Sequence, residues 1–179
     1  MTQRLVALLR GINVGGTRKL PMAELRTACA DAGLGEVATH IQSGNLVLDG
    51  ADPAAAEAAL EALITKRFGL DVPVVARKAG DWAKLAAHCP FPAAAKETPN
   101  FVLLLVAKRP PAKDAVAALA ARARYDEAVA RCGPEIAIHF PAGSGKSKLT
   151  PALIDRLVGS PTTTRNWATV LKLADMAAA

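Results

Sequence analysis

Short apolar runs in the first half of the chain have the length and spacing of β-strands. Residues 4–12 are apolar on both faces, which predicts a central strand, and Pro73 predicts that the last strand lies at a sheet edge, since proline cannot donate to a ladder. Ser43-Gly44-Asn45 is a hairpin turn signal. We therefore predict strands at residues 4–12, 36–42, 46–49 and 72–78.

Two amphipathic stretches lie between these strands. Pro21 suits the first turn of a helix, and the predicted apolar stripe of that helix consists of Met22, Leu25, Cys29 and Ala32. Asp52 and Pro53 suit the N-cap and first residue of a second helix that ends near Phe68. The resulting order, β-α-β-β-α-β, predicts a ferredoxin-like plait over residues 1–78.

The second half, residues 79–179, follows a similar plan. Its predicted elements are a short helix at 81–88, a Pro- and Ala-rich linker at 89–99, a strand at 101–108, a helix at 113–122, a hairpin of residues 126–132 and 135–140, and two closing helices at 148–158 and 164–175. This order predicts a variant plait with two C-terminal helices. The expected fold class is α+β, with two ferredoxin-like (α-β plait) subdomains packed in one compact body.

Composition excludes several classes of protein. With 51% hydrophobic and 21% charged residues in 179, the chain has the composition of a folded domain rather than a disordered one. The longest apolar run, Phe101–Ala107, is too short to span a membrane, and Arg10 interrupts the N-terminal apolar stretch, which argues against a signal peptide. We expect a cytoplasmic protein with no membrane association.

Cysteine and histidine positions give no indication of a metal site or a disulfide framework. Three widely spaced cysteines without a C-x-x-C pair are typical of buried or incidental thiols in a reducing compartment. The three histidines lack metal-ligand spacing, and no acid close in sequence joins His40 and Ser43 into a catalytic relay. The sequence therefore implies no metal and no cofactor.

The net charge of +6 favours anionic partners, and the positive charge is unevenly distributed. Residues 1–23 contain four basic side chains and no acid, and the Gly-rich loop Asn13–Lys19 lies among them. Residues 143–147, GSGKS, resemble a Walker A loop, but Phe140 occupies the position of its first glycine. Pro151 further predicts that the next helix begins after the motif, which argues against a P-loop NTPase.

Two segments of the second half are candidates for an anion site. Glycine-rich backbone with Lys146 and Lys148 before a helix suits an anion, although a solvated turn with two surface lysines explains it equally well. Residues 162–167 are predicted to open the last helix, where Arg165 would oppose the helix dipole and so indicate a negative ligand or a carboxylate. Trp167 is expected in the core.

The plait is also an RNA-recognition fold, but base stacking is disfavoured here. The predicted strands at 4–12 and 46–49 contain no aromatic residue on which a base could stack. Electrostatic contact with a nucleic-acid backbone remains open.

Four separated motifs, ALLRGINVGG, IQSGN, GKSKLT and TTRNWATVLKL, occur in this order between Ala7 and Leu173. Together they resemble a bacterial family of uncharacterised proteins, domain-of-unknown-function family 1697. The resemblance implies two ferredoxin-like plaits and brings no established activity, cofactor or catalytic residue. The chain departs from the family at His40, where the family has an aromatic residue.

The leading hypothesis is a protein that binds an anionic ligand, either a phosphorylated small molecule or a nucleic-acid backbone. The alternatives are a phosphate-handling transferase or hydrolase that uses the same pocket, and a protein-interaction scaffold; whether the protein is an enzyme stays open. The candidate ligand-binding residues are polar, basic or glycine residues of the predicted turns and helix starts: Arg10, Asn13, Gly16, Lys19, Gln42, Ser43, Asn45, Lys146, Lys148, Arg165 and Asn166.

An anion needs several donors within about 3 Å, and no single segment supplies enough of them. We therefore expect the turn after the first strand, the hairpin tip and the start of the last helix to face a common cleft. The plait makes part of this difficult, since the turn leaving the first strand and the turn joining the next two strands are expected at opposite ends of a strand.

Overall fold

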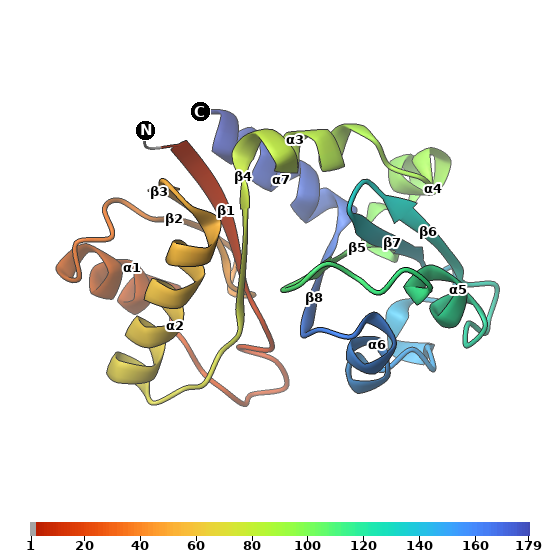
Figure 1. Ribbon diagram of the computed structural model, residues 1–179, viewed down its shortest axis with the longest axis horizontal. Coiled ribbons are helices and arrows are strands. Elements are labelled where there is room, and N and C mark those ends of the chain that lie inside the picture. Colours follow the sequence, from red (N-terminus) through yellow and green to blue (C-terminus); the bar gives the residue numbers. More distant parts are fainter. Residues whose placement is uncertain (1–2) are drawn as a thin grey trace. The chain divides into compact units, whose positions relative to one another are not determined.

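Two separate four-stranded antiparallel sheets, each with its own helices, organise the chain (Figure 1). The structure is a computed structural model and describes residues 3–179. The chain divides into a first unit, made of the chain up to Trp82 with Leu173–Ala179, and a second unit, Ala83–Lys172. The predicted α+β class with two subdomains is confirmed.

The first unit has the plait topology that its sequence pattern predicts. Its elements are β1 (Gln3–Leu9), α1 (Met22–Asp31), β2 (Ala38–His40), β3 (Asn45–Gly50), α2 (Pro53–Phe68) and β4 (Val74–Lys78). The strand order is β2-β3-β1-β4, so β1 is central and β4 lies at an edge, as predicted. Apolar side chains on one face of this sheet pack against α1 and α2.

Two strands of the first unit are shorter than predicted because the backbone leaves the extended conformation. Strand β1 ends at Leu9, and Gly11 has φ +61°, a left-handed conformation that cannot continue a strand. Strand β2 covers Ala38–His40 rather than residues 36–42, since Ile41 has φ +49°. Positive φ angles thus mark where both strands end.

The helices of the first unit follow their predicted signals closely. The Asp52 side chain accepts a hydrogen bond from the Ala55 N–H at 2.9 Å, which caps α2 directly before Pro53. Helix α1 buries Met22, Leu25 and Cys29 as predicted, but Ala28 is the further buried residue. The prediction of Ala32 on this stripe is wrong, because α1 ends at Asp31 and Ala32 is its exposed C-cap.

The second unit also contains a four-stranded sheet, of order β6-β7-β5-β8. Two helices precede this sheet, α3 (Ala79–Ala87) and α4 (Pro92–Glu97), followed by the short 3₁₀ turn η1 (Pro99–Phe101). The remaining elements are β5 (Val102–Ala107), α5 (Ala115–Ala120), β6 (Ala128–Cys132), β7 (Glu135–His139), the 3₁₀ turn η2 (Ser144–Lys146), α6 (Pro151–Val158), β8 (Thr162–Asn166) and α7 (Trp167–Ala178). Helices α3 and α7 each contribute residues to both units.

The main departure from the sequence prediction is strand β8. Residues 162–166 were predicted to start the last helix, but they pair antiparallel with β5, with Leu104 opposite Arg165. Three successive threonines explain this, because β-branched side chains favour a strand. The second unit is therefore a complete β-α-β-β-α-β plait, and α7 begins at Trp167, which is buried as expected.

The Pro- and Ala-rich segment 89–99, predicted as a linker, contains helix α4. Alanine is the strongest helix former, and Pro92 occupies the first turn, where proline is tolerated. Among residues 3–179, no helix has both the length and the apolar character needed to cross a membrane.

Candidate functional site

Three segments of the first unit meet at one end of its sheet: residues 10–20 after β1, residues 41–45 between β2 and β3, and residues 69–73 before β4. We call this region the first loop end. Strands β1 and β3 are antiparallel with Leu8 opposite Asn45, and the Leu9 N–H donates to the Gly44 carbonyl at 2.8 Å. The expectation that these two turns lie at opposite ends of a strand is wrong, because antiparallel pairing places the end of β1 beside the start of β3.

Asn13 fastens the first segment to the second. Its Nδ2 donates to the carbonyls of Leu20 at 2.9 Å and Gln42 at 2.6 Å, while its Oδ1 accepts from the Leu20 N–H at 2.8 Å. Asparagine tolerates the left-handed conformation that this residue adopts, with φ +53°. The Asn13 side chain therefore holds the loop in place, which is a positioning role.

The hairpin tip is built in the same way from polar side chains. Asn45 is fully buried, and its Nδ2 donates to the His40 carbonyl at 3.0 Å and to the Ser43 Oγ at 2.9 Å. Gly44 has φ +79°, and a Cβ there would lie 2.6 Å from the Leu9 Cβ, so no other residue fits. Ser43 and Asn45 thus shape the turn, and the Gln42 side chain is exposed.

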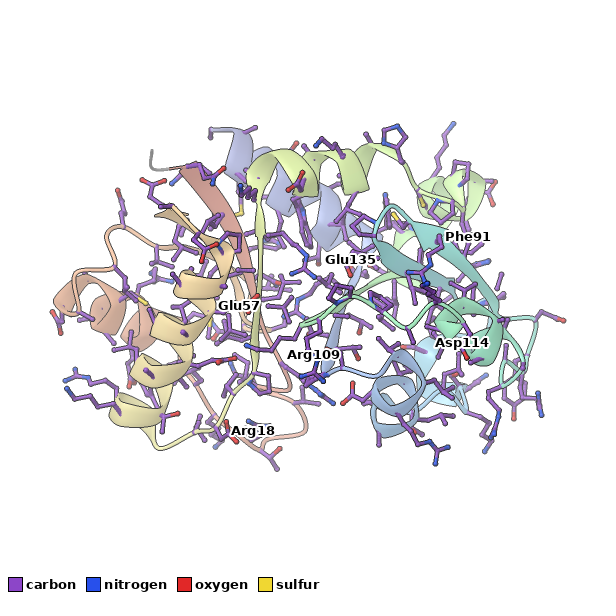
Figure 2. The ribbon with its side chains drawn as sticks, in the orientation of Figure 1. Arg18, Glu57, Phe91, Arg109, Asp114 and Glu135 are labelled. Atoms are coloured by element: carbon purple, nitrogen blue, oxygen red, sulfur yellow. The ribbon has the colours of Figure 1, made fainter. Side chains whose placement is uncertain are left out.

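The third segment joins through two basic residues. The Arg10 N–H donates to the Pro73 carbonyl at 3.0 Å, and the Arg18 guanidinium donates to the Asp71 carbonyl. Arg18 belongs to the loop after β1, and its side chain reaches the segment that precedes β4 (Figure 2). Arg10 is half-buried, while Arg18 and Lys19 are exposed. The first loop end therefore presents three cationic side chains on a hydrogen-bonded frame.

Gly16 lies at the exposed tip of this region. Val14 and Thr17 form a β-bridge around Gly15 and Gly16, whose φ angles of +58° and +77° suit a tight hairpin turn. Val14 is 64% exposed and Ile41 is 55% exposed. Sequence reasoning missed both apolar side chains, although Val14 stands between the basic residues Arg10 and Arg18.

Ile41 adopts a strained backbone. A β-branched residue at φ +49° is rare, since its Cβ substituents crowd the backbone, and such strain tends to cluster at functional sites. Asn13 and Arg18 also have positive φ. Asparagine tolerates this conformation, so Arg18 and Ile41 are the two strained non-glycine residues of the region, and their strain supports the first loop end as the candidate site.

The GSGKS segment of the second unit forms a separate loop. Lys146 ends the 3₁₀ turn η2 and is exposed, as is Lys148. Helix α6 begins after the motif, as predicted, but at Pro151 rather than at the predicted residue 148, and the Thr150 Oγ1 accepts from the Leu153 N–H at 3.4 Å. Thr150 therefore caps the N-terminus of α6, which disfavours an anion bound jointly by this helix end and the two lysines.

Arg165 and Asn166 occupy surroundings different from those predicted. Arg165 lies in β8, is 8% exposed, and its Nη1 donates to the Thr163 Oγ1 and the Thr164 carbonyl, each at 2.7 Å. Burial lowers the pKa of Arg165 to about 10. The argument from a helix dipole is wrong for this residue, because it belongs to a strand.

Asn166 ends β8 and caps the helix that follows it. Its Oδ1 accepts from the Thr169 N–H at 2.9 Å, and its Nδ2 donates to the Asn100 Oδ1 at 3.1 Å. The structure thus gathers the seven candidates of the first unit into one loop end. The other four, Lys146, Lys148, Arg165 and Asn166, belong to the second unit.

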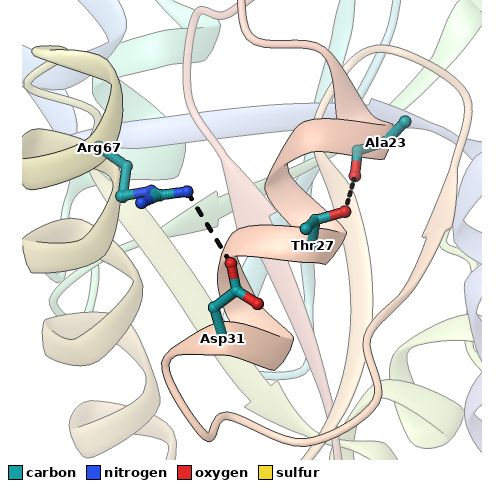
Figure 3. A network of polar contacts seen from close by, with 4 residues as sticks. All are labelled: Ala23, Thr27, Asp31 and Arg67. Carbon is teal, nitrogen blue, oxygen red and sulfur yellow. Dashed lines mark hydrogen bonds and ion pairs between the residues drawn. The ribbon is translucent and has the colours of Figure 1, made fainter.

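An open groove lies between α1 and α2, lined by Glu24, Thr27, Lys66, Arg67 and Phe68. Figure 3 shows Arg67 of α2 facing Asp31 of α1, with the Arg67 Nη2 3.9 Å from the Asp31 Oδ2 and the Thr27 hydroxyl donating to the Ala23 carbonyl. The lining contains one acid, Glu24, and two bases, Lys66 and Arg67, and Arg67 is paired with Asp31, so the groove offers little net positive charge to an anion. Sequence reasoning did not indicate it.

Thiol and metal chemistry add no second candidate. Cys29 and Cys132 are buried, and burial raises the pKa of each thiol to about 11, so neither is a nucleophilic thiolate near neutral pH. Burial also raises the pKa of the half-buried Cys89. Within residues 3–179, no group of three His, Cys, Asp or Glu side chains could hold a metal ion.

Comparisons with known proteins agree with the motifs. The model of the family described as "Protein of unknown function (DUF1697)" matches residues 1–136. A solved structure of a conserved bacterial protein from Streptococcus pneumoniae is similar over 99% of both chains, with 24% sequence identity and a TM-score of 0.77, which shows a shared fold. No curated protein matches the sequence. The family match covers well over half of the chain, so this protein belongs to the DUF1697 family.

Proposed function

We propose that the first loop end binds an anionic ligand, either a phosphorylated small molecule or the phosphate backbone of a nucleic acid. The observation that supports this most directly is its charge. Its three segments contain the cations Arg10, Arg18 and Lys19 and a single acid, Asp71. Arginine and lysine side chains are the common partners of phosphate groups in proteins.

The frame of the site supports the same proposal. Asn13 and Asn45 fix the backbone of two segments through the hydrogen bonds described above, so the region is organised before a ligand arrives. A preorganised site loses less entropy on binding than a flexible one. The Arg18 guanidinium uses one donor on the Asp71 carbonyl and has four further N–H groups with which to contact a ligand.

A protein-interaction scaffold is the second candidate function, and Val14 and Ile41 favour it. Exposed apolar side chains beside positive charge are typical of surfaces that contact an acidic protein partner. A phosphate-handling transferase or hydrolase and a cytoplasmic location stay predictions.

Two binding measurements test the proposed function. Fluorescence anisotropy with fluorescein-labelled single-stranded and double-stranded oligonucleotides tests the nucleic-acid backbone, and a thermal-shift screen with nucleotides and sugar phosphates tests small ligands. The substitution Lys19→Glu should weaken binding at least about tenfold, which corresponds to about 1.4 kcal/mol.

Lys66→Glu is the matched control, since Lys66 is equally a surface lysine of the first unit but lies at the end of α2. It should leave the affinity within about twofold of the unmodified protein, because a charge outside the site acts only through a screened field. Equal loss in both variants would show a general charge effect, and absence of any binding at low salt would refute the proposal.

A further inference from the structure

The two units repeat one another in the hydrogen bonds that join their loops. In the first unit, the residue after the first strand, Arg10, donates its N–H to Pro73, which directly precedes the last strand, at 3.0 Å. In the second unit, Lys108 after β5 donates its N–H to Pro161 directly before β8, at 2.9 Å. A basic residue therefore occupies the same topological position in both plaits.

The second helix of each unit shows the same repetition. The N–H of the first residue of β4, Val74, donates to the Glu61 Oε1 of α2 at 2.8 Å. The N–H of the first residue of β8, Thr162, donates to the Asp155 Oδ1 of α6 at 2.9 Å. Both helices also begin with a proline and end at a glycine with positive φ. The equivalence of the two units extends to individual contacts.

This equivalence identifies a second cationic region, which we call the second loop end: residues 108–113, 131–135 and 159–161. Its single acid is the buried Glu135, whose Oε2 accepts from the Ala107 N–H at 3.2 Å. The Arg109 N–H donates to the Ser160 Oγ at 2.8 Å, and its Nη2 donates to the Gly159 carbonyl at 3.1 Å. This arrangement resembles that of Arg18, whose guanidinium also donates to a carbonyl between the second helix and the last strand. Figure 2 shows Arg109 on the chain that leaves β5.

Arg131 brings a further positive charge to the same place, since its Nη2 donates to the Ala112 carbonyl at 3.1 Å. Lys113 follows directly and is exposed, as are Arg109 and Arg131. Residues 98–113 contain no acid, as residues 1–23 contain none, and Asp114 comes next in the chain. Each first strand and the loop after it therefore carry positive charge alone.

We propose that the second loop end is a further binding site for phosphate groups, formed by Lys108, Arg109, Lys113 and Arg131. This inference rests on the proposed function, because equivalence with the first loop end supplies the class of ligand. The two sites differ in one respect. Pro110 and Pro111 replace the glycine hairpin of the first unit and have no backbone N–H to donate, so side chains supply the contacts.

An NMR titration of the ¹⁵N-labelled chain with sodium pyrophosphate at low ionic strength tests this inference. We expect saturable shifts of amides in residues 108–113 and 159–161, separate from those in residues 10–19 and 41–45. The double variant Lys108→Gln/Lys113→Gln should weaken binding at the second loop end at least about fivefold and leave the first unchanged. Lys84→Gln/Lys96→Gln, with two surface lysines of α3 and α4, is the matched control and should shift neither affinity.

Each outcome separates the two proposals. Shifts confined to the first loop end would overturn the second site and leave the proposed function standing. Shifts confined to the second loop end would support the second site and overturn the first. No shift in either region would overturn the second site and the small-phosphate form of the proposed function, while the oligonucleotide titrations test its nucleic-acid form. A dispersed spectrum of each variant shows that the chain is folded.

Discussion

Ile41 is the residue at which the effect of backbone strain on stability can be measured separately from its effect on ligand binding. A β-branched residue at φ +49° costs of the order of 1–3 kcal/mol, whereas asparagine tolerates this conformation. Ile41→Asn should therefore raise the free energy of unfolding by about 1 kcal/mol in urea denaturation. If the strain or the apolar side chain serves the site, the same variant will bind its ligand more weakly.

Val14→Asn is the control for Ile41→Asn. Val14 is similarly exposed but is absent from the residues with positive φ, so its replacement should change stability by less than about 0.5 kcal/mol. Loss of stability in Ile41→Asn would contradict the expectation, because it would mean that the packing of the Ile41 side chain outweighs its backbone strain.

Arg165 is the candidate residue whose surroundings differ most from those predicted. The substitution Arg165→Ala removes the guanidinium that donates to the buried Thr163 hydroxyl. It also leaves a cavity beside β8 where the arginine side chain was. We expect the free energy of unfolding to fall by about 2 kcal/mol, measured by urea denaturation. Arg156→Ala, at an exposed arginine of α6, should change it by less than about 0.5 kcal/mol. If Arg165→Ala leaves the free energy of unfolding unchanged, Arg165 does not stabilise the fold, and ligand binding becomes the explanation for a buried arginine at this position.

At the scale of elements, acidic side chains protect the edge strand of the first unit. The Val74 and Ala76 N–H groups of β4 donate to Glu61 and Glu57 of α2, each at 2.8 Å. Unpaired N–H groups at an edge invite pairing with another chain. Carboxylates of the neighbouring helix thus complete the hydrogen bonds that a further strand would otherwise make.

Glu57→Ala should lower the free energy of unfolding by about 1–3 kcal/mol, because the Ala76 N–H loses its acceptor, and should increase light scattering on storage. Glu57→Gln keeps a carbonyl oxygen in the same place and should recover most of both effects. If glutamine and alanine destabilise the chain equally, the hydrogen bond to β4 is not what Glu57 contributes.

The elements that the sequence predicts well are those whose local signals agree with one another. Helix α2 has an N-cap, a first-turn proline and a terminal glycine in series, and β1 is apolar on both faces. The threonines of β8 are the opposite case, because threonine suits both a helix cap and a strand. Only pairing with β5 decides between these two structures, and that pairing joins residues far apart in the chain.

At the scale of the whole molecule, the two plaits have the same strand order, and each unit's first strand lies between its third and fourth. The turn residues of the first loop end could be identified from glycine and basic side chains alone. The proximity of these turns in space could not be predicted from the sequence, because it depends on the antiparallel register of β1 and β3. The sequence did not indicate the second loop end, because Pro110 and Pro111 stand where the first unit has its glycine hairpin, so the two loops have no sequence pattern in common.

Salt dependence links the charge of both loop ends to the proposed function. Each phosphate contact with single-stranded nucleic acid contributes about −0.7 to the slope of log K against log salt, so the three basic residues of the first loop end set a limit near −2 and the four of the second loop end a limit near −3. We expect anisotropy titrations of a single-stranded oligonucleotide to give a slope between about −1 and −3, and Lys19→Gln to make it shallower by about 0.7 if Lys19 contacts a phosphate. The same reduction should follow from Lys113→Gln if the second loop end contacts the strand. A slope near zero would show that binding does not depend on phosphate contacts, and the exposed apolar pair Val14 and Ile41 would then favour an interaction with protein.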